Sequence, residues 1–357
     1  MSNRRTTRCR PSGGSPSGPG TYDAAVRQAI VDTVQPFGTR VEITTDDERF
    51  VVAAHHAMSR YPASAAMRGT FVIRATSVAD APADPAWPVT EMRQRDGLVQ
   101  LSCGSGRMLV DLNAGRSEIS LPRSLVAIED AARLFVEGAM WTWLIGTGRV
   151  RAVHAGMVGD GRRAALLRGA SGAGKSTITY ACMRAGMLMA SDDWVYSATT
   201  RSSTELHGYP WRLFLVADAA TRFDELRGRE LVAHPGSDRW KLPVTPSPEQ
   251  QLLSADPDVV IFLDPASELS LRSVGKAESR QRFWSSALPS ERERLGRRWI
   301  NRLLDKPCYV LQRGTDPDAA AALVATVLGD ARRPERRAIG LSEVSLNDGA
   351  PAPLGSA

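Results

Sequence analysis

The chain has 357 residues, which is room for one large domain or two ordinary ones. Hydrophobic residues make up 43% of it and charged residues 24%, so we expect a globular protein rather than a disordered one. The formal net charge of +6 would suit a nucleic-acid partner. Arginines in the two terminal segments account for this excess and leave the middle of the chain close to neutral, so we expect no nucleic-acid binding.

The cysteines and the apolar runs bear on where the protein works. Its cysteines, Cys9, Cys103, Cys182 and Cys308, are scattered and show no metal-site spacing, which suits a reducing cytoplasm. No apolar stretch reaches the length of about 18 residues that a membrane helix needs. The N-terminal arginines are not followed by the apolar segment of a secretory signal. We therefore expect a cytoplasmic protein without a membrane partner.

The N-terminal part predicts a small α+β accessory domain over 21–147, preceded by a disordered basic tail over 1–20. The pattern of apolar residues and turn signals indicates each element in turn. In chain order we expect a helix over 24–34, strands over 41–43 and 69–75, a β-hairpin of 98–103 with 107–112, a strand over 118–121 and a long helix over 125–145.

The C-terminal part predicts an α/β domain over 148–333, followed by a tail over 334–357. The expected strands cover 150–158, 164–168, 187–190, 204–206, 211–215, 259–263 and 309–312. The expected helices cover 175–184, 218–226 and 316–328.

The strongest motif is Gly169-Ala170-Ser171-Gly172-Ala173-Gly174-Lys175-Ser176, which fits the phosphate-binding pattern GxxxxGK[ST] between an apolar strand and a helix. Its glycines let backbone N–H groups meet phosphate oxygens at the positive end of a helix. Lys175 should reach the β- and γ-phosphates, and the Ser176 hydroxyl should ligate Mg²⁺, with Thr177 beside it. The motif predicts that this segment binds a nucleoside triphosphate together with Mg²⁺. We expect the nucleotide to be ATP.

Two further features flank this motif. Asp192 and Asp193 end the strand that follows the motif's helix, where ligands bind in an open α/β sheet. One carboxylate could hold Mg²⁺, and the other could accept a proton from an attacking hydroxyl. His154 precedes the motif inside an apolar strand, where a histidine by itself is more often a core residue than a catalytic one.

Together, His154, the motif at 169–176 and the Ser191-Asp192-Asp193 segment resemble the catalytic segment of HPr kinase/phosphorylase and its relatives. The resemblance implies a P-loop kinase fold related to phosphoenolpyruvate carboxykinase, and phosphoryl transfer from ATP to a serine hydroxyl. It makes Lys175 the phosphate lysine, Ser176 and Asp192 the metal side, and Asp192 and Asp193 the catalytic carboxylates that His154 supports. Lys175 then also acts in catalysis.

The resemblance covers about a fifth of the chain, and two departures stand out. In Glu205-Leu206-His207-Gly208 a histidine stands where the family has an arginine, and the family's Gly-Arg-Asn segment is not found. The chain is similar to a divergent group that includes kinases of lasso-peptide precursors. The expected partner is a peptide or small protein with a serine hydroxyl, recognised by the accessory domain. Self-association into a homo-oligomer is a further option.

Other residues are candidates for single roles. A phosphoryl-transfer site needs a cation beyond the P-loop, and Arg239 and Lys241 are our choice, with Arg212 as a third option. Asp264, after the apolar strand 259–263, competes with Asp192 for the metal as a Walker B residue. Two alternatives to a peptide kinase therefore stay open: a kinase of a small hydroxylated molecule, and a nucleotide-gated regulatory ATPase that uses Asp264.

Overall fold

The computed structural model describes residues 29–61, 69–80, 91–199, 203–233 and 240–330, so the predicted tails at 1–20 and 334–357 lie outside the described residues. The chain folds into two compact units. The first unit comprises Met1–Arg151, Ala198–Arg201 and Glu230–Lys241. The second comprises Ala152–Ser197, Ser202–Arg229 and Leu242–Ala357. Two short segments thus group with the first unit after the chain has entered the second.

The first unit is built on a seven-stranded mixed sheet. Its strands are β1 (Ile30–Val34), β2 (Arg40–Thr45), β3 (Thr70–Val78), β4 (Glu91–Arg95), β5 (Leu98–Cys103), β6 (Gly106–Asp111) and β7 (Arg116–Pro122). They lie in the order β1-β2-β3-β7-β6-β5-β4. The pairs β2–β3 and β3–β7 are parallel, whereas β1–β2 and the β7-β6-β5-β4 run are antiparallel.

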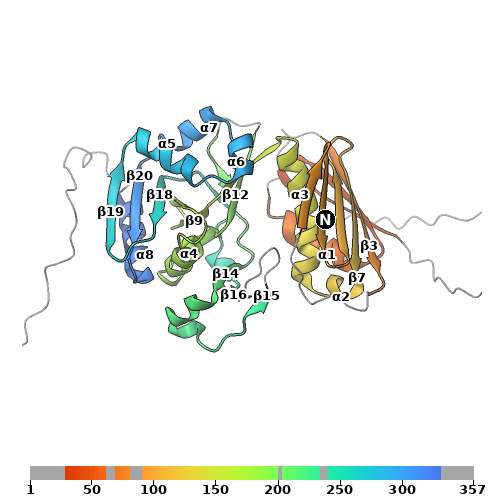
Figure 1. Cartoon of the computed structure of the whole chain (residues 1–357), viewed down its shortest axis with the longest axis horizontal. Helices are drawn as coiled ribbons and strands as arrows, with labels where there is room; N and C mark the ends of the chain where they lie inside the picture. Colours follow the sequence, from red (N-terminus) through yellow and green to blue (C-terminus); the bar gives the residue numbers. More distant parts are fainter. Residues whose placement is uncertain (1–28, 62–68, 81–90, 200–202, 234–239, 331–357) are drawn as a thin grey trace, which may run out of the picture. The chain divides into compact units, whose positions relative to one another are not determined.

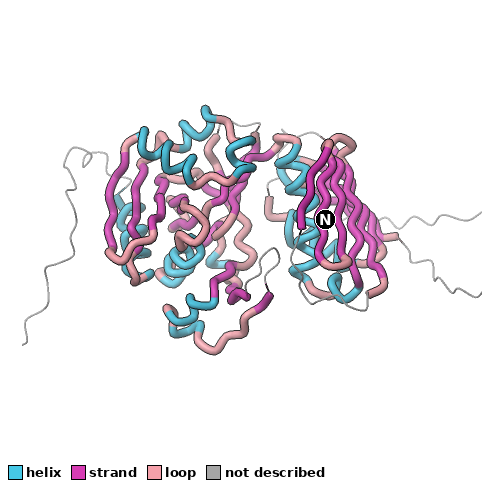
Figure 2. The backbone as a smooth tube through the Cα atoms, in the orientation of Figure 1, coloured by secondary structure: helices cyan, strands magenta, loops and turns pink. Residues whose placement is uncertain are grey.

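Helices cover one face of this sheet, as Figure 2 shows. The helices are α1 (Glu48–Met58), α2 (Arg123–Val126), α3 (Glu129–Gly146) and the 3₁₀ turn η1 (Pro36–Gly38). Trp141 and Trp143 of α3 both lie in the core. Trp143 stacks on Phe71 of β3 with ring centroids 4.9 Å apart, and Trp141 packs edge-on against Tyr61.

The β-hairpin prediction is confirmed, because β5 and β6 pair antiparallel around Gly104. The predicted helix over 24–34 is wrong where the structure describes it: Ile30–Val34 is a strand that pairs with β2. Its β-branched residues fit a pleated, half-buried surface better than a helix. The predicted helix over 125–145 is interrupted at Ile128, whose extended backbone separates α2 from α3.

The second unit contains a six-stranded sheet in the order β11-β9-β10-β18-β20-β19. Its strands are β9 (Gly156–Gly159), β10 (Ala164–Arg168), β11 (Leu188–Ser191), β18 (Val259–Asp264), β19 (Leu269–Val274) and β20 (Cys308–Arg313). The pairs β10–β18 and β18–β20 are parallel. Because β9 pairs antiparallel with both β10 and β11, β10 and β11 also run in the same direction.

The remaining described strands form two smaller sheets. One has the order β17-β13-β12-β8 and contains β8 (Val150–His154), β12 (Trp194–Ala198), β13 (Leu206–His207) and β17 (Ser254–Ala255). The other has the order β14-β16-β15 and contains β14 (Leu213–Val216), β15 (Val232–Ala233) and β16 (Trp240–Val244).

Helices pack on both faces of the six-stranded sheet, which gives a mixed α/β arrangement (Figure 1). They are α4 (Lys175–Arg184), α5 (Lys276–Ser285), α6 (Pro289–Arg294), α7 (Arg297–Leu303) and α8 (Pro317–Asp330), with the 3₁₀ turns η2 (Ala217–Thr221), η3 (Asp224–Leu226) and η4 (Pro248–Gln250). Phe283 of α5 and Trp299 of α7 join the core on one face, and α4 packs against α8 on the other. No helix in the described part of the chain is long and apolar enough to cross a membrane.

Two predicted elements of this unit are wrong. The single strand expected over 150–158 is two strands in different sheets, because the chain changes sheet at Ala155. At the start of β9, Gly156 lets the chain pass close to α4, since a Cβ there would lie 2.8 Å from the Thr179 hydroxyl oxygen. The helix expected over 218–226 is two 3₁₀ turns, because the chain extends at Phe223 to bury that ring against Tyr180.

The topology brings several strand ends to one edge of the six-stranded sheet. β10, β11, β18 and β20 all run in one direction, so their carboxyl ends meet there. The antiparallel β9 begins at the same edge, directly after His154 and Ala155. The motif at 169–176, the Asp192–Asp193 pair, Asp264 and Arg313 therefore all follow or end strands at this edge.

Gly208 fixes a close approach of the backbone near this edge. A Cβ at Gly208 would overlap the carbonyl group of Ala190 and lie 2.7 Å from the Ala190 side chain. The Gly208 N–H also donates to the Leu253 carbonyl oxygen at 3.0 Å. Only glycine lets the segment after β13 pass so close to β11, the strand that leads to Asp192.

We expect Gly208→Ala to lower the free energy of unfolding by about 3 kcal/mol or more, since overpacking against backbone cannot be relieved by a rotamer change. The matched control is Gly329→Ala in α8, where a Cβ meets nothing within 4 Å. That change should be neutral or stabilise by up to about 1 kcal/mol, because alanine favours helix. Calorimetric unfolding of both variants checks this, and equal transitions for the two would contradict it.

Candidate active site

The loop between β10 and α4 has the geometry that a phosphate-binding turn requires. Gly172 and Gly174 adopt positive φ values of 80° and 97°, a conformation that other residues rarely adopt. A Cβ at Gly169 would lie 2.8 Å from the Ala173 side chain and 3.0 Å from the Leu263 carbonyl oxygen. Helix α4 begins at Lys175, directly after Gly174. The first N–H groups of this helix therefore face the loop, where they can meet an anion.

Lys175 lies inside this loop. Its Nζ donates hydrogen bonds to the carbonyl oxygens of Gly169 at 3.0 Å and Ala170 at 3.3 Å. Burial lowers the pKa of the ammonium group, while the carboxylates of Asp193 and Asp192 act in the opposite direction. A buried cation held by carbonyl oxygens is well placed to meet phosphate oxygens.

Asp192 contacts the P-loop helix directly. The Ser176 hydroxyl donates a hydrogen bond to its carboxylate, and the backbone N–H of Phe214 donates another. Desolvation and then the neighbouring charge of Asp193 raise the pKa of Asp192 to about 7, against the lowering effect of these hydrogen bonds. Two oxygen groups of the kind that Mg²⁺ prefers thus lie side by side at the start of α4.

Asp193 has different surroundings from Asp192. His154 Nε2 lies 3.0 Å from Asp193 Oδ1, and the Asp193 side chain is 63% exposed whereas that of His154 is 12% exposed. The Ser191 hydroxyl oxygen accepts hydrogen bonds from the backbone N–H groups of Asp193 and Trp194, which shapes the turn that carries both carboxylates. The Trp194 ring lies 5.4 Å from the His154 ring, so an aromatic side chain borders this pair.

A buried ion pair underlies the His154 position. Arg168, the last residue of β10, and Glu291 of α6 have almost no exposed surface, and Arg168 Nη1 lies 2.7 Å from Glu291 Oε1. Glu291 also accepts from the backbone N–H of His154 at 3.0 Å, and Arg168 donates to the His154 carbonyl oxygen at 3.0 Å. The Arg168 guanidinium lies 4.1 Å from the centre of the Phe283 ring. Both peptide groups of His154 are therefore held by one ion pair.

Asp264 occupies the Walker B position at the end of β18, but its carboxylate is already paired. Arg282 Nη1 of α5 lies 2.7 Å from Asp264 Oδ2, and Arg282 Nε contacts Glu278 at 2.7 Å. The carboxylate that hydrogen-bonds to the P-loop serine is that of Asp192. This arrangement favours Asp192 over Asp264 as the metal-side residue.

The structure places differently the three basic residues that the sequence predicted to contact phosphate. Arg239 lies outside the described residues. Lys241 lies on β16, in register with Val232, and it groups with the first compact unit, so its role at a nucleotide stays a prediction. Arg212 lies 5.9 Å from the Trp211 ring centre, two residues before the Phe214 N–H that binds Asp192.

Ser176 and Asp192 are the described residues that would hold Mg²⁺ together with a nucleotide. Among the residues that the structure describes, no group of three or more histidine, cysteine, aspartate or glutamate side chains could hold a metal. Mg²⁺ commonly uses one or two protein oxygens, with phosphates and waters completing the shell. Ser176 and Asp192 match that requirement. The three described cysteines, Cys103, Cys182 and Cys308, are buried and form no disulfide with one another.

Four residues of this region have structural roles that were not predicted from the sequence: Arg168, Glu291, Arg313 and Ser191. Arg168 and Glu291 are 123 positions apart, and nothing in either local pattern indicates the other. Arg313 directly follows the predicted strand 309–312, and an arginine at the carboxyl end of an apolar strand in an α/β sheet is a signal that could have found it. Ser191 could likewise have been recognised as a turn former, since its hydroxyl follows a strand.

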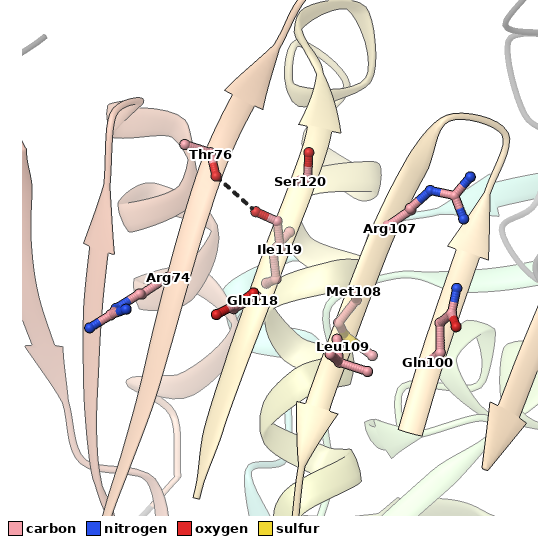
Figure 3. A pocket seen from close by; sticks show the side chains of 9 residues that line it. All are labelled: Arg74, Thr76, Gln100, Arg107, Met108, Leu109, Glu118, Ile119 and Ser120. Atoms are coloured by element: carbon pink, nitrogen blue, oxygen red, sulfur yellow. Dashed lines mark hydrogen bonds between the residues drawn. The ribbon is translucent and has the colours of Figure 1, made fainter. Parts of the chain in front are cut away.

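A separate hollow lies in the first unit, on the sheet face opposite its helices. Its volume is about 470 Å³, and Figure 3 shows side chains of β3, β5, β6 and β7 around it. Arg74, Arg107 and Glu118 supply its charged groups, and Thr76 donates to the Ile119 carbonyl oxygen at 3.3 Å. The hollow is open to solvent, unlike the enclosed pocket that a small-molecule site prefers.

A comparison with solved structures gives distant likenesses, whereas comparisons with family models and curated proteins give none. No model of a protein family matches the sequence. No protein of curated function matches it either. Among solved structures, the chain is similar to the Hpr(Ser) kinase/phosphatase from Coxiella burnetii, at 12% sequence identity and a TM-score of 0.26, over 50% of this chain and 90% of that one.

We expect Glu291→Gln to lower the free energy of unfolding by roughly 3–5 kcal/mol, because it leaves the buried Arg168 guanidinium without its counter-charge. The control is Asp224→Asn, which removes the exposed partner of Arg227 in a pair 2.8 Å apart and should cost less than about 1 kcal/mol. Thermal unfolding measured by calorimetry compares them. Similar small losses for both would mean that the Arg168–Glu291 pair contributes little.

Proposed function

We propose that this protein is an ATP-dependent kinase that transfers the γ-phosphate of ATP to a serine hydroxyl of a peptide or small protein. The observation that carries the proposal is the hydrogen bond from Ser176, in the phosphate-binding sequence, to Asp192, next to the Asp193–His154 pair. A nucleotide switch needs one carboxylate beside its metal. A kinase also needs a group beside the acceptor hydroxyl, and Asp193 supplies a candidate.

The different surroundings of the two carboxylates support a division of roles. Asp192 is bonded to Ser176 and partly buried, which suits the metal side. Asp193 is largely exposed and paired with His154, which suits contact with an incoming acceptor. The His154 ring keeps the Asp193 carboxylate oriented, and the buried ion pair of Arg168 and Glu291 holds the backbone of His154 in turn.

The proposed reaction is an in-line displacement. The acceptor oxygen forms a bond to the γ-phosphorus while the bond from that phosphorus to the bridging oxygen of ADP breaks, and the hydroxyl proton passes to Asp193. Lys175 and the N–H groups at the start of α4 stabilise the charge on the phosphate oxygens. Bound Mg²⁺, held by Ser176 and Asp192, would neutralise charge on the β- and γ-phosphates.

The acceptor class follows from the resemblance of the catalytic segment to HPr-kinase-related enzymes and is part of the proposal. We assign its recognition to the first unit, whose open sheet face carries the charged hollow of Arg74, Arg107 and Glu118. A small hydroxylated molecule is the second candidate acceptor, with the same P-loop chemistry. The regulatory ATPase is the third candidate. The pairing of Asp264 with Arg282 speaks against it.

A phosphate-transfer assay separates these candidates. Incubation with ATP, Mg²⁺ and serine-containing peptides should add one phosphoryl group to a peptide, detected by mass spectrometry, and the matched peptides with alanine for serine should gain none. Chelation of Mg²⁺ should abolish the transfer. Steady ATP hydrolysis without a phosphorylated product from any peptide or small hydroxylated molecule would favour the ATPase instead.

The carboxylates give a second test. Asp192→Asn and Asp193→Asn should each lower the transfer rate by roughly 10²–10⁴-fold, because one removes a metal ligand and the other a proton acceptor. Asp264→Asn should retain much of the rate, since its side chain pairs with Arg282. Rates are compared among variants whose unfolding temperature matches that of the parent. An inactive Asp264→Asn with active Asp192→Asn and Asp193→Asn would place the metal at Asp264 and refute the proposal.

A further inference from the structure

Arg313 ends a strand at the same sheet edge as the P-loop. Strand β20 runs parallel to β18, and β18 runs parallel to β10, so the carboxyl ends of all three meet at this edge. Arg313 is the last residue of β20 and precedes Gly314, whose φ of 60° turns the chain toward α8. Groups at this position face the place where ligands bind in open α/β sheets.

The Arg313 side chain lies against the P-loop itself. A Cβ built at Gly174 would lie 2.9 Å from Arg313 Cδ and 3.0 Å from Arg313 Nε. Gly174 is the N-cap residue of α4, directly before Lys175. Its lack of a side chain, in addition to its positive φ, therefore makes room for the arginine. The guanidinium therefore lies beside the start of α4, where the phosphates of the proposed nucleotide would bind.

The charge of Arg313 has no counter-charge in the described part of the chain. Its Nε is buried without a hydrogen-bond partner, and no carboxylate among the described residues forms an ion pair with it. Two other guanidinium groups near this edge are paired: Arg168 with Glu291, and Arg282 with Asp264. Among the described residues, Arg313 thus differs from these two arginines in forming no ion pair with a carboxylate.

Electrostatics makes this position unfavourable unless an anion is present. The start of a helix carries a partial positive charge, and Lys175 adds a full one beside it. Without an anion, a further cation at this position raises the electrostatic energy of the folded protein. When negative phosphate oxygens lie between the positive charges, the same cation lowers that energy. Guanidinium groups suit this role because their donors match the oxygens of a phosphate group.

We propose that Arg313 binds the phosphate chain of the nucleotide, as the cation beyond the P-loop that phosphoryl transfer requires. This inference rests on the proposed function, since it assumes a nucleotide at the P-loop. It places the cation at the end of β20 rather than at Arg239 or Lys241. Arg313 would donate from its guanidinium to phosphate oxygens, while Lys175 approaches them from inside the loop.

Binding measurements by isothermal titration calorimetry test the assignment, with Mg²⁺ present and with ATP and inorganic tripolyphosphate as probes. Arg313→Met keeps most of the length of the side chain and its packing against Gly174 but removes the charge and the donors. We expect it to weaken binding of both probes by roughly ten- to a hundredfold. Arg313→Lys should recover part of the loss, because it restores a charge without the fork of donors.

The matched control is Lys306→Ala, which removes one positive charge before the opposite end of β20, where Lys306 pairs with Asp256. It should leave both affinities within about twofold, which separates a local contact from the overall charge. Unchanged affinity in a folded Arg313→Met would overturn the inference and leave the proposed function intact. Loss of ATP binding with tripolyphosphate binding unchanged would also overturn it, since the guanidinium would then contact the base or sugar.

Two results tell this inference apart from the proposed function. If the parent protein binds neither ATP nor tripolyphosphate, both the inference and the kinase proposal fail. If both probes bind, and binding depends on Arg313 but no acceptor is phosphorylated, the assignment of Arg313 stands and the kinase proposal fails.

Discussion

The buried ion pair of Arg168 and Glu291 is the interaction on which the candidate site most depends. It joins the end of β10, where the phosphate-binding loop starts, to α6 and to both peptide groups of His154. A buried pair of this kind adds little net stability over apolar packing, but its loss is costly because each charge needs the other. The pair therefore acts as a positional constraint. It sets His154 relative to the P-loop, and His154 sets Asp193.

The strand order then determines which side chains meet at this edge of the six-stranded sheet. The strand order places β9 between β10 and β11, so the segment of His154 and Ala155 before β9 lies between the loop after β10 and the turn after β11. His154 can then face Asp193 while Asp192 faces Ser176. Two adjacent carboxylates on one turn thus have different neighbours and different charge environments.

The first unit has a different physical character. Its sheet is covered by α1 and α3 on one face, and the other face carries charged side chains, among them Arg74, Arg107 and Glu118, together with exposed apolar ones such as Leu109. An antiparallel run with one solvated face is stable without further cover. Such a face has the donors and charges to meet an extended peptide, whereas its open hollow gives a small molecule little enclosure. This contrast is why we assign acceptor recognition to this unit and phosphate chemistry to the second.

Local sequence determined those parts of the protein whose cause is local. The glycines and lysine of the loop at 169–176, strand β10 and helix α4 lie where the pattern placed them, because turn conformation and helix initiation depend on neighbouring residues. The break at Ala155 and the two turns around Phe223 needed the tertiary structure, since packing against distant residues overrode the local apolar pattern.

Only the tertiary structure decided which charges meet. Glu291 lies 123 positions from Arg168, and Arg282 pairs with Asp264 at the end of β18. Arg313 comes to Gly174 through the parallel pairing of β10, β18 and β20, which no local pattern specifies. Sequence by itself thus determined the glycine-rich loop at 169–176 and the helix that follows it. The fold decided which carboxylate and which arginine face it, because long-range strand order, not residue type, brings those side chains together.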